Sequence, residues 1–127
     1  NKWAFHATGH KCDPAVDGKY NNCDRGGQCT VDVYYDAQGQ YGPGSQYTVN
    51  TEFPFTVKTE FHEADLKFTG YTMTFSQQGR SFQMSTGDCS YLNLMSWDVT
   101  TMAFAFSHWD GGGLDWMQHG VCSGGCQ

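Results

Sequence analysis

Apolar and polar residues alternate along much of the chain from Gln46 onward, which is the pattern of strands that bury one face. The clearest run places Phe55, Val57 and Phe61 on one parity, and Lys58 with other polar residues on the opposite parity. This pattern predicts a strand over residues 53–62. The same reasoning predicts further strands over residues 66–75, 80–85, 92–97 and 102–109, with a turn at residues 77–79.

The first 45 residues show little alternation. They are rich in Gly, Asp, Asn and Cys, a composition that is typical of loops. We predict a disulfide-tethered loop region over residues 1–45, with one short strand over residues 30–35, followed by antiparallel strands over residues 46–127. Because the sequence contains neither an internal repeat nor a linker, we expect one all-β domain over residues 1–127, or the C-terminal part of one.

The last of the predicted strands has two unlike faces, since side chains alternate across a strand. One face carries Met102, Phe104 and Phe106, which can build a core, and the other carries small residues and ends in Trp109. A flat indole on a shallow face is suited to stacking against a pyranose ring. Trp116, beyond a glycine-rich turn, is a candidate for a second platform. The alternative interpretation is that either indole simply packs in the core.

The charge of the chain narrows its possible partners. The 127 residues carry a formal net charge of −6. Nucleic acids and anionic membrane surfaces both attract a cationic face, so we expect neither as a partner. A neutral polymer such as a polysaccharide stays open. The sequence also has no run of about 20 apolar residues, the length that crosses a bilayer as a helix.

Six cysteines in a chain of this length indicate disulfides and an oxidising, extracellular compartment. Their spacings do not resemble a metal site, because no Cys-x-x-Cys pair is present and the histidines are not spaced as ligands beside them. Asp110 and Asp115 flank a glycine-rich turn, but this pattern is too sparse for calcium and fits turn chemistry. We therefore expect no metal and no cofactor. Six cysteines allow many connectivities, so the spacing alone does not fix the pairing.

Several stretches match, in order, the motifs of one known family. Residues 1–12 resemble the stretch that follows its catalytic carboxylates, and residues 23–29 and 41–45 resemble its Cys-Asp-Pro-Asp-Gly-Cys and Phe-Tyr-Gly-Pro-Gly-Ser motifs. Residues 55–61 resemble Phe-Thr-Val-Val-Thr-Gln-Phe, and residues 102–110 resemble Met-Val-Leu-Val-Met-Ser-Leu-Trp-Asp. Each motif alone is weak, but their order over nearly the whole chain is specific. The chain resembles the cellulases of glycoside hydrolase family 7.

The resemblance implies a concanavalin-like jelly-roll β-sandwich, of which this chain would be the disulfide-stapled C-terminal portion. In that family a concave sheet holds a cellulose chain on tryptophan platforms, and Trp109 and Trp116 match two of these. Asp110 belongs to the same motif as Trp109, and His10 matches a histidine beside the cleavage site. We therefore predict these four as substrate-binding residues. Both prolines that flank the family's histidine are replaced here, and the alternative for His10 is a place on a surface loop.

The resemblance also implies what the chain lacks for catalysis. The family hydrolyses with retention, using a nucleophile and an acid/base carboxylate roughly 5 Å apart. These come from a Glu-x-Asp-x-x-Glu motif, which this sequence does not contain. Glu60, Glu63 and Asp65 have the wrong spacing, and we expect them to face solvent. The family's product-binding arginines are also replaced, near Tyr35 and His119. We predict no catalytic residue in this chain, and expect the carboxylates to come from an N-terminal segment or a partner chain.

The resemblance assigns the disulfides. It implies that Cys12 pairs with Cys23 and that Cys29 pairs with Cys89, while Cys122 matches a cysteine whose partner lies far upstream in the family. Cys126 has no counterpart. Cys122 and Cys126 either bond to each other or reach a second chain. Half of a sandwich would expose strand edges and apolar faces, so we expect a companion chain, possibly linked through Cys122, or a homo-oligomer.

Two functions are consistent with these observations. The first is a secreted, polysaccharide-binding chain of a family 7 cellulase-like β-1,4-glucan hydrolase, active only together with the segment that bears the carboxylates. The alternative is a non-catalytic, lectin-like protein that binds β-glucan or a related polysaccharide. A purely structural extracellular protein is a third and weaker reading.

Overall fold

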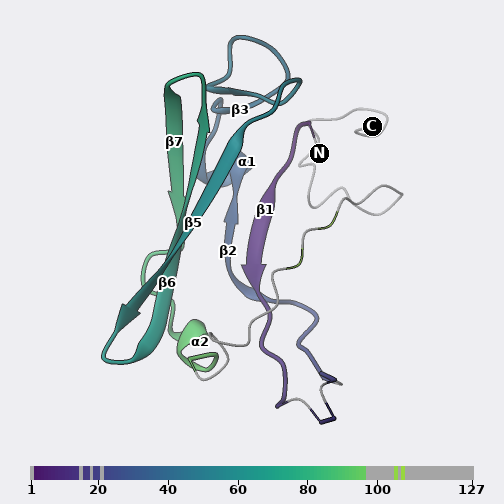
Figure 1. Ribbon diagram of the computed structural model, residues 1–127, viewed down its shortest axis with the longest axis vertical. Helices are drawn as coiled ribbons and strands as arrows, with labels where there is room; N and C mark the ends of the chain where they lie inside the picture. Colours follow the sequence, from purple (N-terminus) through teal and green to yellow (C-terminus); the bar gives the residue numbers. More distant parts are fainter. Residues whose placement is uncertain are drawn as a thin grey trace.

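The computed structural model describes residues 2–14, 16–17, 19–20, 22–96, 105 and 107. Strands predominate and helix is scarce, as the all-β prediction requires. The elements in chain order are β1 (His6–Gly9), β2 (Gln28–Asp32), α1 (Val33–Asp36), β3 (Tyr41–Gly42), β4 (Val49–Asn50), β5 (Thr56–Ala64), β6 (Lys67–Gln77), β7 (Arg80–Ser85) and α2 (Ser90–Asn93) (Figure 1).

The strands β5, β6 and β7 form an antiparallel sheet in the order of the sequence. Two-residue turns join them, and both central residues of each turn have positive φ: 51° and 59° at Asp65 and Leu66, and 50° and 79° at Gln78 and Gly79. This is the type I′ geometry, whose twist matches that of the strands it connects. The predicted turn at residues 77–79 and the predicted strand over residues 80–85 are thus confirmed, and β6 extends the predicted strand over residues 66–75 to Gln77.

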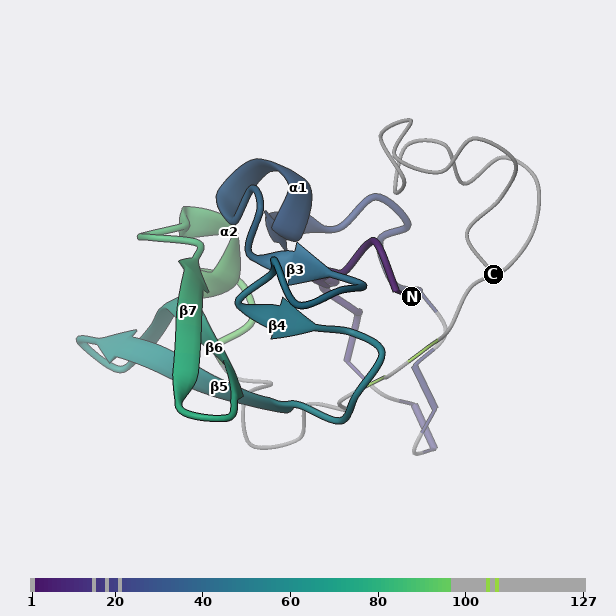
Figure 2. The same cartoon turned by 90° about the horizontal axis from the view of Figure 1, so that it is seen from above.

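The other strands lie on one face of this sheet. β1 and β2 form an antiparallel ribbon, and β3 and β4 form a short parallel pair. The ribbon stands beside the long sheet with α2 near one end (Figure 1), and the view from above places α1, β3 and β4 on the same side of the sheet (Figure 2). Contacts of β2 with β7 and of β4 with β6 join the two layers. The expectation of purely antiparallel strands after residue 46 is therefore wrong for β4.

Phe75, fully buried near the C-terminal end of β6, is the centre of the core. Its ring stacks on Phe82 with centroids 4.9 Å apart, and it makes edge-to-face contacts with Phe5 and Tyr41, whose ring centroids lie 5.0 and 6.0 Å from its own. These rings come from both layers, so aromatic packing joins the sheet to the segments around it. The remaining buried apolar residues that surround this cluster include Val31, Val33, Val49, Tyr71, Met73, Met84 and Leu92.

A buried tyrosine fastens the β1–β2 ribbon to the sheet. The hydroxyl of Tyr71 on β6 lies 3.0 Å from the carbonyl oxygen of Ala7 and 2.7 Å from that of Cys29. Burial, aided by the charge of Asp36, raises the pKa of Tyr71 well above its usual value of 10.0. The phenol therefore stays protonated, as a hydrogen-bond donor must.

Two disulfides complete the fold, Cys12–Cys23 and Cys29–Cys89. These are the two pairings that the family resemblance implies. The first joins two cysteines 11 positions apart in the loop between β1 and β2, and the second joins β2 to the residue that precedes α2, 60 positions away. Cys122 and Cys126 lie outside the described residues.

Two predicted strands are wrong in part because local hydrogen bonds favour helical turns. The predicted strand over residues 30–35 ends at Asp32, whose carboxylate caps α1 by accepting from the amide of Tyr34 at 2.8 Å. Within the range 92–97, the amide of Met95 donates to the carbonyl of Leu92 at 2.9 Å, and these two residues are buried while Leu94 is 56% exposed. That spacing is helical, not the spacing of a strand.

Other predictions from the sequence are confirmed only in part, and one falls mostly on residues outside the described part of the chain. Residues 1–45 hold three strands and a helical turn, more than the one strand predicted, because β1 pairs with the distant β2. Of the strand predicted over residues 53–62, β5 includes the part from Thr56, and Phe53 and Phe61 on the predicted inner parity are 60% and 47% exposed. The predicted strand over residues 102–109 lies outside the described residues except for Ala105 and Ser107, which are not in a strand. The described strands form sheets of two, two and three strands.

Candidate functional site

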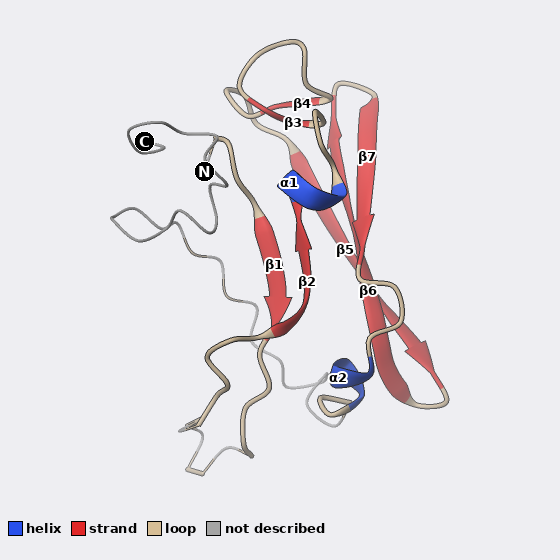
Figure 3. Cartoon of the chain, turned by 180° about the vertical axis from the view of Figure 1, so that it is seen from behind, coloured by secondary structure: helices blue, strands red, loops and turns tan. Residues whose placement is uncertain are grey.

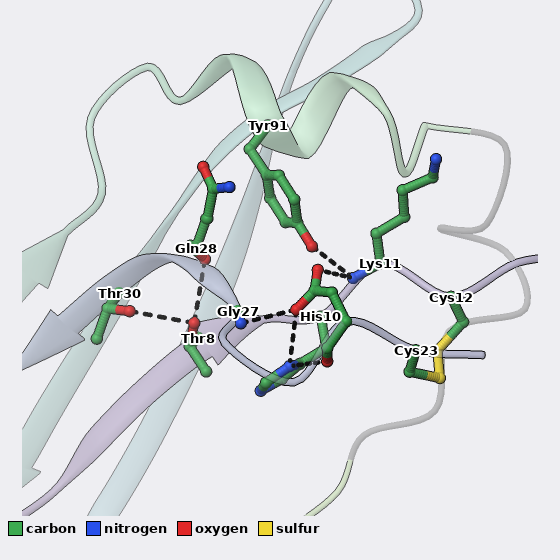
Figure 4. A network of polar contacts seen from close by, with 10 residues as sticks. Thr8, His10, Lys11, Cys12, Cys23, Gly27, Gln28, Thr30 and Tyr91 are labelled. Carbon is green, nitrogen blue, oxygen red and sulfur yellow. Dashed lines mark hydrogen bonds and ion pairs between the residues drawn. A yellow bond between two sulfur atoms is a disulfide. The ribbon is translucent and has the colours of Figure 1, made fainter.

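His10 follows β1 directly and is held by Asp24 in the loop that leads back to β2. Its ring nitrogen Nδ1 lies 2.9 Å from the backbone carbonyl oxygen of Asp24 and 3.2 Å from the carboxylate oxygen Oδ1 (Figure 4). Both of these oxygens only accept hydrogen bonds, so Nδ1 carries the proton. In the neutral ring Nε2 is then the acceptor, available to a ligand hydroxyl. The side chain of His10 is 42% exposed.

Asp24 organises the whole loop around His10. Its carboxylate accepts from the amide of Gly27 at 2.7 Å and from the amide of Lys11 at 3.2 Å, besides the contact with His10. Desolvation acts to raise the pKa of Asp24, but the hydrogen bonds from Gly27, Lys11 and His10 together lower the pKa below its usual value of 3.8. Asp24 therefore stays ionised in mildly acidic solution and keeps the loop in this conformation.

Three further features tie this loop to the fold. The disulfide Cys12–Cys23 closes its base, and the hydroxyl of Tyr91 on α2 lies 2.8 Å from the amide of Lys11 (Figure 4). At the other side of the loop, the hydroxyl of Thr8 donates to the carbonyl of Gln28 at 3.1 Å. The His10 site is thus an exposed, well-braced hydrogen-bonding group, formed by residues far apart in the sequence.

A second candidate site is a hollow of about 340 Å³ near the start of β1. We call it the aromatic hollow, and it is lined by Trp3, Val33, Tyr34, Gln38, Gly39, Tyr41 and Tyr47. Four of these residues are aromatic and none is charged. Its size is at the lower end of the range for small-ligand pockets, which is roughly 300 to 1,000 Å³. Aromatic walls with one amide side chain match the needs of a neutral sugar, which offers C–H faces and hydroxyl edges.

Local structure explains why these rings gather. The cap at Asp32 turns the chain into α1 and so places Tyr34 and Gln38 beside the end of the ribbon. A β-carbon on residue 42 would come within 2.7 Å of the Tyr47 ring, so Gly42 allows that ring to lie flat against the backbone. Burial raises the pKa of Tyr41 to about 12, which keeps its phenol neutral.

The two candidate sites lie at opposite ends of the β1–β2 ribbon. His6 pairs with Asp32 at the end near the aromatic hollow, and Gly9 pairs with Gln28 at the end near His10. Figure 3 shows the ribbon from behind, with α1 at one end and the loop that contains His10 at the other. A single sugar residue therefore cannot contact both sites, whereas an extended oligosaccharide could.

Sequence reasoning missed the aromatic hollow. Trp3 and Tyr41 belong to the region predicted as loop, whereas Tyr34 belongs to the strand predicted over residues 30–35. Tyr47 belongs to the region predicted as antiparallel strands, and the four rings approach one another only through the pairing of β1 with β2 and of β3 with β4. The available signal was the density of tyrosines between residues 34 and 47 in an otherwise polar segment. Of the substrate-binding residues predicted from the sequence, His10 is described, whereas Trp109, Asp110 and Trp116 lie outside the described residues.

The acidic residues considered for catalysis lie away from these sites. Glu60, Glu63 and Asp65 are exposed on β5 and its turn. Within the described part of the chain, no group of three or more His, Cys, Asp or Glu side chains could hold a metal ion, and no helix is long and apolar enough to cross a membrane.

Comparisons with known proteins add no assignment: no model of a protein family matches the chain, and no curated protein matches it.

Proposed function

We propose that this chain binds a β-1,4-glucan or a closely related polysaccharide, as the non-catalytic part of a secreted, retaining hydrolase of the family 7 cellulase type. The observation that carries the binding proposal is the aromatic hollow, because four rings and an uncharged lining suit a neutral sugar. The collinear motifs of the sequence connect the chain to cellulases, and the two disulfides are consistent with an extracellular protein. The jelly-roll sandwich of that family is part of this proposal.

In this proposal the ribbon supports an extended glucan. The rings of Trp3 and Tyr34 would cover one sugar face, and Gln38 would bind a hydroxyl at the rim. At the far end of the ribbon, Nε2 of His10 would accept from another hydroxyl. Trp109 and Trp116 would add the stacking platforms implied by the resemblance. The carboxylates of the Glu-x-Asp-x-x-Glu motif would be supplied by an N-terminal segment or companion chain.

A lectin-like protein without catalysis is the second candidate, and one observation favours it. Every residue that lines the aromatic hollow belongs to residues 3–47 of this chain. A sugar could therefore bind without any residue from a companion. The two functions differ in whether a companion that bears the carboxylates restores hydrolysis with retention at the anomeric carbon.

The binding proposal is tested by titrating cellohexaose into the chain and into the variants Trp3→Ala and Tyr34→Ala. Loss of one stacking contact should raise the dissociation constant by roughly five- to tenfold. Tyr20→Ala is the matched control, because Tyr20 is an exposed tyrosine that does not line the hollow. Each variant is first checked for native circular dichroism. Equal affinity in the wild type and both hollow variants, or no binding by the folded wild type, would contradict the proposal.

A further inference from the structure

β5 is an edge of the three-stranded sheet. It pairs with β6 along one side, and no strand among the described residues pairs with its other side. The long strand is visible at the border of the sheet in Figures 1 and 2. Its pairing with β6 is regular from Thr56 to His62, before a bulge at His62 and Glu63. Over these seven residues, the backbone N–H and C=O groups of every second residue point away from β6. Such a row of unpaired groups is the usual template for pairing with another strand.

The two faces of β5 differ in character. Val57, Thr59 and Phe61 lie opposite Phe75, Met73 and Tyr71 of β6, three residues that are buried. The alternate residues Lys58, Glu60 and His62 are exposed on the outer face.

Phe61 is exposed to an unusual degree for its position. It remains 47% exposed although Tyr71, directly across from it, is only 5% exposed. Its ring contacts Phe68 edge-on with centroids 5.4 Å apart, so this contact covers only part of the ring.

The sequence of β5 is complementary to itself when it is reversed about Thr59. In an antiparallel pair of two copies centred on Thr59, Lys58 of each copy faces Glu60 of the other, and Val57 of each copy faces Phe61 of the other. Opposite charges and aromatic to β-branched pairs are the cross-strand neighbours that stabilise antiparallel sheets. The two-fold symmetry makes every one of these pairs occur twice.

We propose that two copies of this chain associate through antiparallel pairing of β5 with β5, centred on Thr59, to form one continuous six-stranded sheet. The partner is a second copy because the charges of this strand complement its own reversed sequence. The pairing would also cover the exposed edge of Phe61 with Val57 of the second copy. This inference does not depend on the proposed function.

The charges also fix the register. Sliding one copy by two residues places either Lys58 opposite Lys58 or Glu60 opposite Glu60, and a shift by one residue would bring inner-face residues opposite outer-face residues. A lysine on an edge strand normally discourages pairing with foreign strands. Within one chain, the Lys58 ammonium already lies 2.9 Å from the Glu60 carboxylate. Lys58 and Glu60 thus disfavour pairing with most strands. They favour a strand that presents a carboxylate opposite Lys58.

The test is sedimentation velocity on the full chain over a range of protein concentrations. A single strand pair is a small interface, so we expect a monomer–dimer equilibrium that shifts with concentration. Glu60→Lys alone and Lys58→Glu alone should each abolish the dimer, because each places like charges opposite one another twice. The double variant Lys58→Glu/Glu60→Lys should dimerise as the wild type does, because exchanging the two charges preserves the complementarity.

Mixing the two single variants gives the sharpest readout. Each is monomeric alone, but together they should form a heterodimer, since a strand with two lysines then faces a strand with two glutamates. Glu63→Lys is the matched control: it makes the same change in charge on an exposed residue of β5 beyond the bulge, and should leave the dimer intact. A wild type that is monomeric at every concentration, a dimer that survives Glu60→Lys, or single variants that do not associate when mixed would each overturn the proposal.

Discussion

Gln77 shows how one buried polar side chain holds a loop to the sheet. From the end of β6, its oxygen Oε1 accepts from the amide of Asn50 at 2.8 Å, and its nitrogen Nε2 donates to the carbonyls of Asn50 at 3.0 Å and Pro54 at 3.1 Å. Gln77 and Asn50 are both more than 90% buried. These bonds satisfy backbone groups of β4 and of the segment leading to β5, and buried backbone groups need such partners.

Gln77→Leu should therefore lower the free energy of unfolding by about 1–3 kcal/mol, because the leucine leaves buried backbone groups without partners. Urea denaturation of the wild type and the variant measures this difference. Gln83→Leu is the control: Gln83 is exposed on the outer face of β7, and its loss should cost less than about 0.5 kcal/mol. Equal losses at the two positions would show that the network around Gln77 contributes no net stability.

His6 couples stability to pH. Desolvation by burial lowers the pKa of His6 below its usual value of 6.5. The charge of Asp32 acts to raise this pKa but does not cancel the effect of burial, and His10 adds a smaller lowering. The folded chain thus favours neutral His6, and the unfolded chain binds the proton first as the pH falls. The resulting stability is fully present above pH 6.5 and is lost as the pH falls through the pKa of the folded state.

The expected result is a urea midpoint that is lower at about pH 5 than at about pH 7.5, with a smaller drop in His6→Gln than in the wild type. Glutamine keeps a polar side chain at the site but does not titrate. The depressed pKa of Asp24 acts only at lower pH, so it does not contribute in this range. An equal drop in the two proteins would assign the pH dependence to another group.

At the scale of elements, hydrophobic alternation predicted the β5–β7 sheet because those strands are long and joined by tight turns. β7 has the predicted bounds, and the turn at Gln78 and Gly79 includes a glycine, the residue that adopts positive φ most readily. α1 and α2 were missed, because single helical turns depend on local caps and on burial. The sequence pattern placed Asp32 within a strand. Only the structure shows that its carboxylate caps α1 by accepting from the amide of Tyr34.

The same reasoning explains which parts of the candidate site could be predicted. His10 was found through a motif, because a motif is local in sequence. The aromatic hollow was not found, since Trp3 and Tyr47 meet only after two separate strand pairs have formed. The hydrophobic pattern also could not show that Phe61 stays exposed. Alternation indicates which residues share a face of a strand, but not what covers that face.

The two disulfides should differ in their effect on stability, since the loops they close differ in length. Chain-entropy arguments give about 4 kcal/mol for the 60-residue separation of Cys29–Cys89 and about 3 kcal/mol for the 11-residue separation of Cys12–Cys23. Urea denaturation of Cys29→Ser/Cys89→Ser and of Cys12→Ser/Cys23→Ser compares them directly. We expect the former to lose more stability, because that bond also joins β2 to the start of α2. A larger loss in the latter would place more stability in the loop around His10 than in the joint between the layers.

In the described part of the chain, a second layer packs on the three-stranded sheet, and three kinds of interaction hold the two layers together. Phe75 supplies apolar contact, the Tyr71 hydroxyl supplies hydrogen bonds to the ribbon, and Cys29–Cys89 supplies a covalent bond. All three act between residues distant in the sequence. The packing of the two layers therefore depends on contacts between distant segments, and no single segment can form it alone.

The disulfide Cys29–Cys89 determines whether the chain stays in one piece after proteolytic cleavage. The turn between β5 and β6 carries Leu66, which is 87% exposed and so accessible to a protease. Cys29 lies before this turn and Cys89 lies after it, so the two pieces produced by cleavage there stay bonded to each other. A molecule cut at this turn would gain only the mass of one water molecule, and its two pieces would separate only after a reducing agent had broken the Cys29–Cys89 bond. Electrophoresis would therefore show one band without a reducing agent and two bands with it.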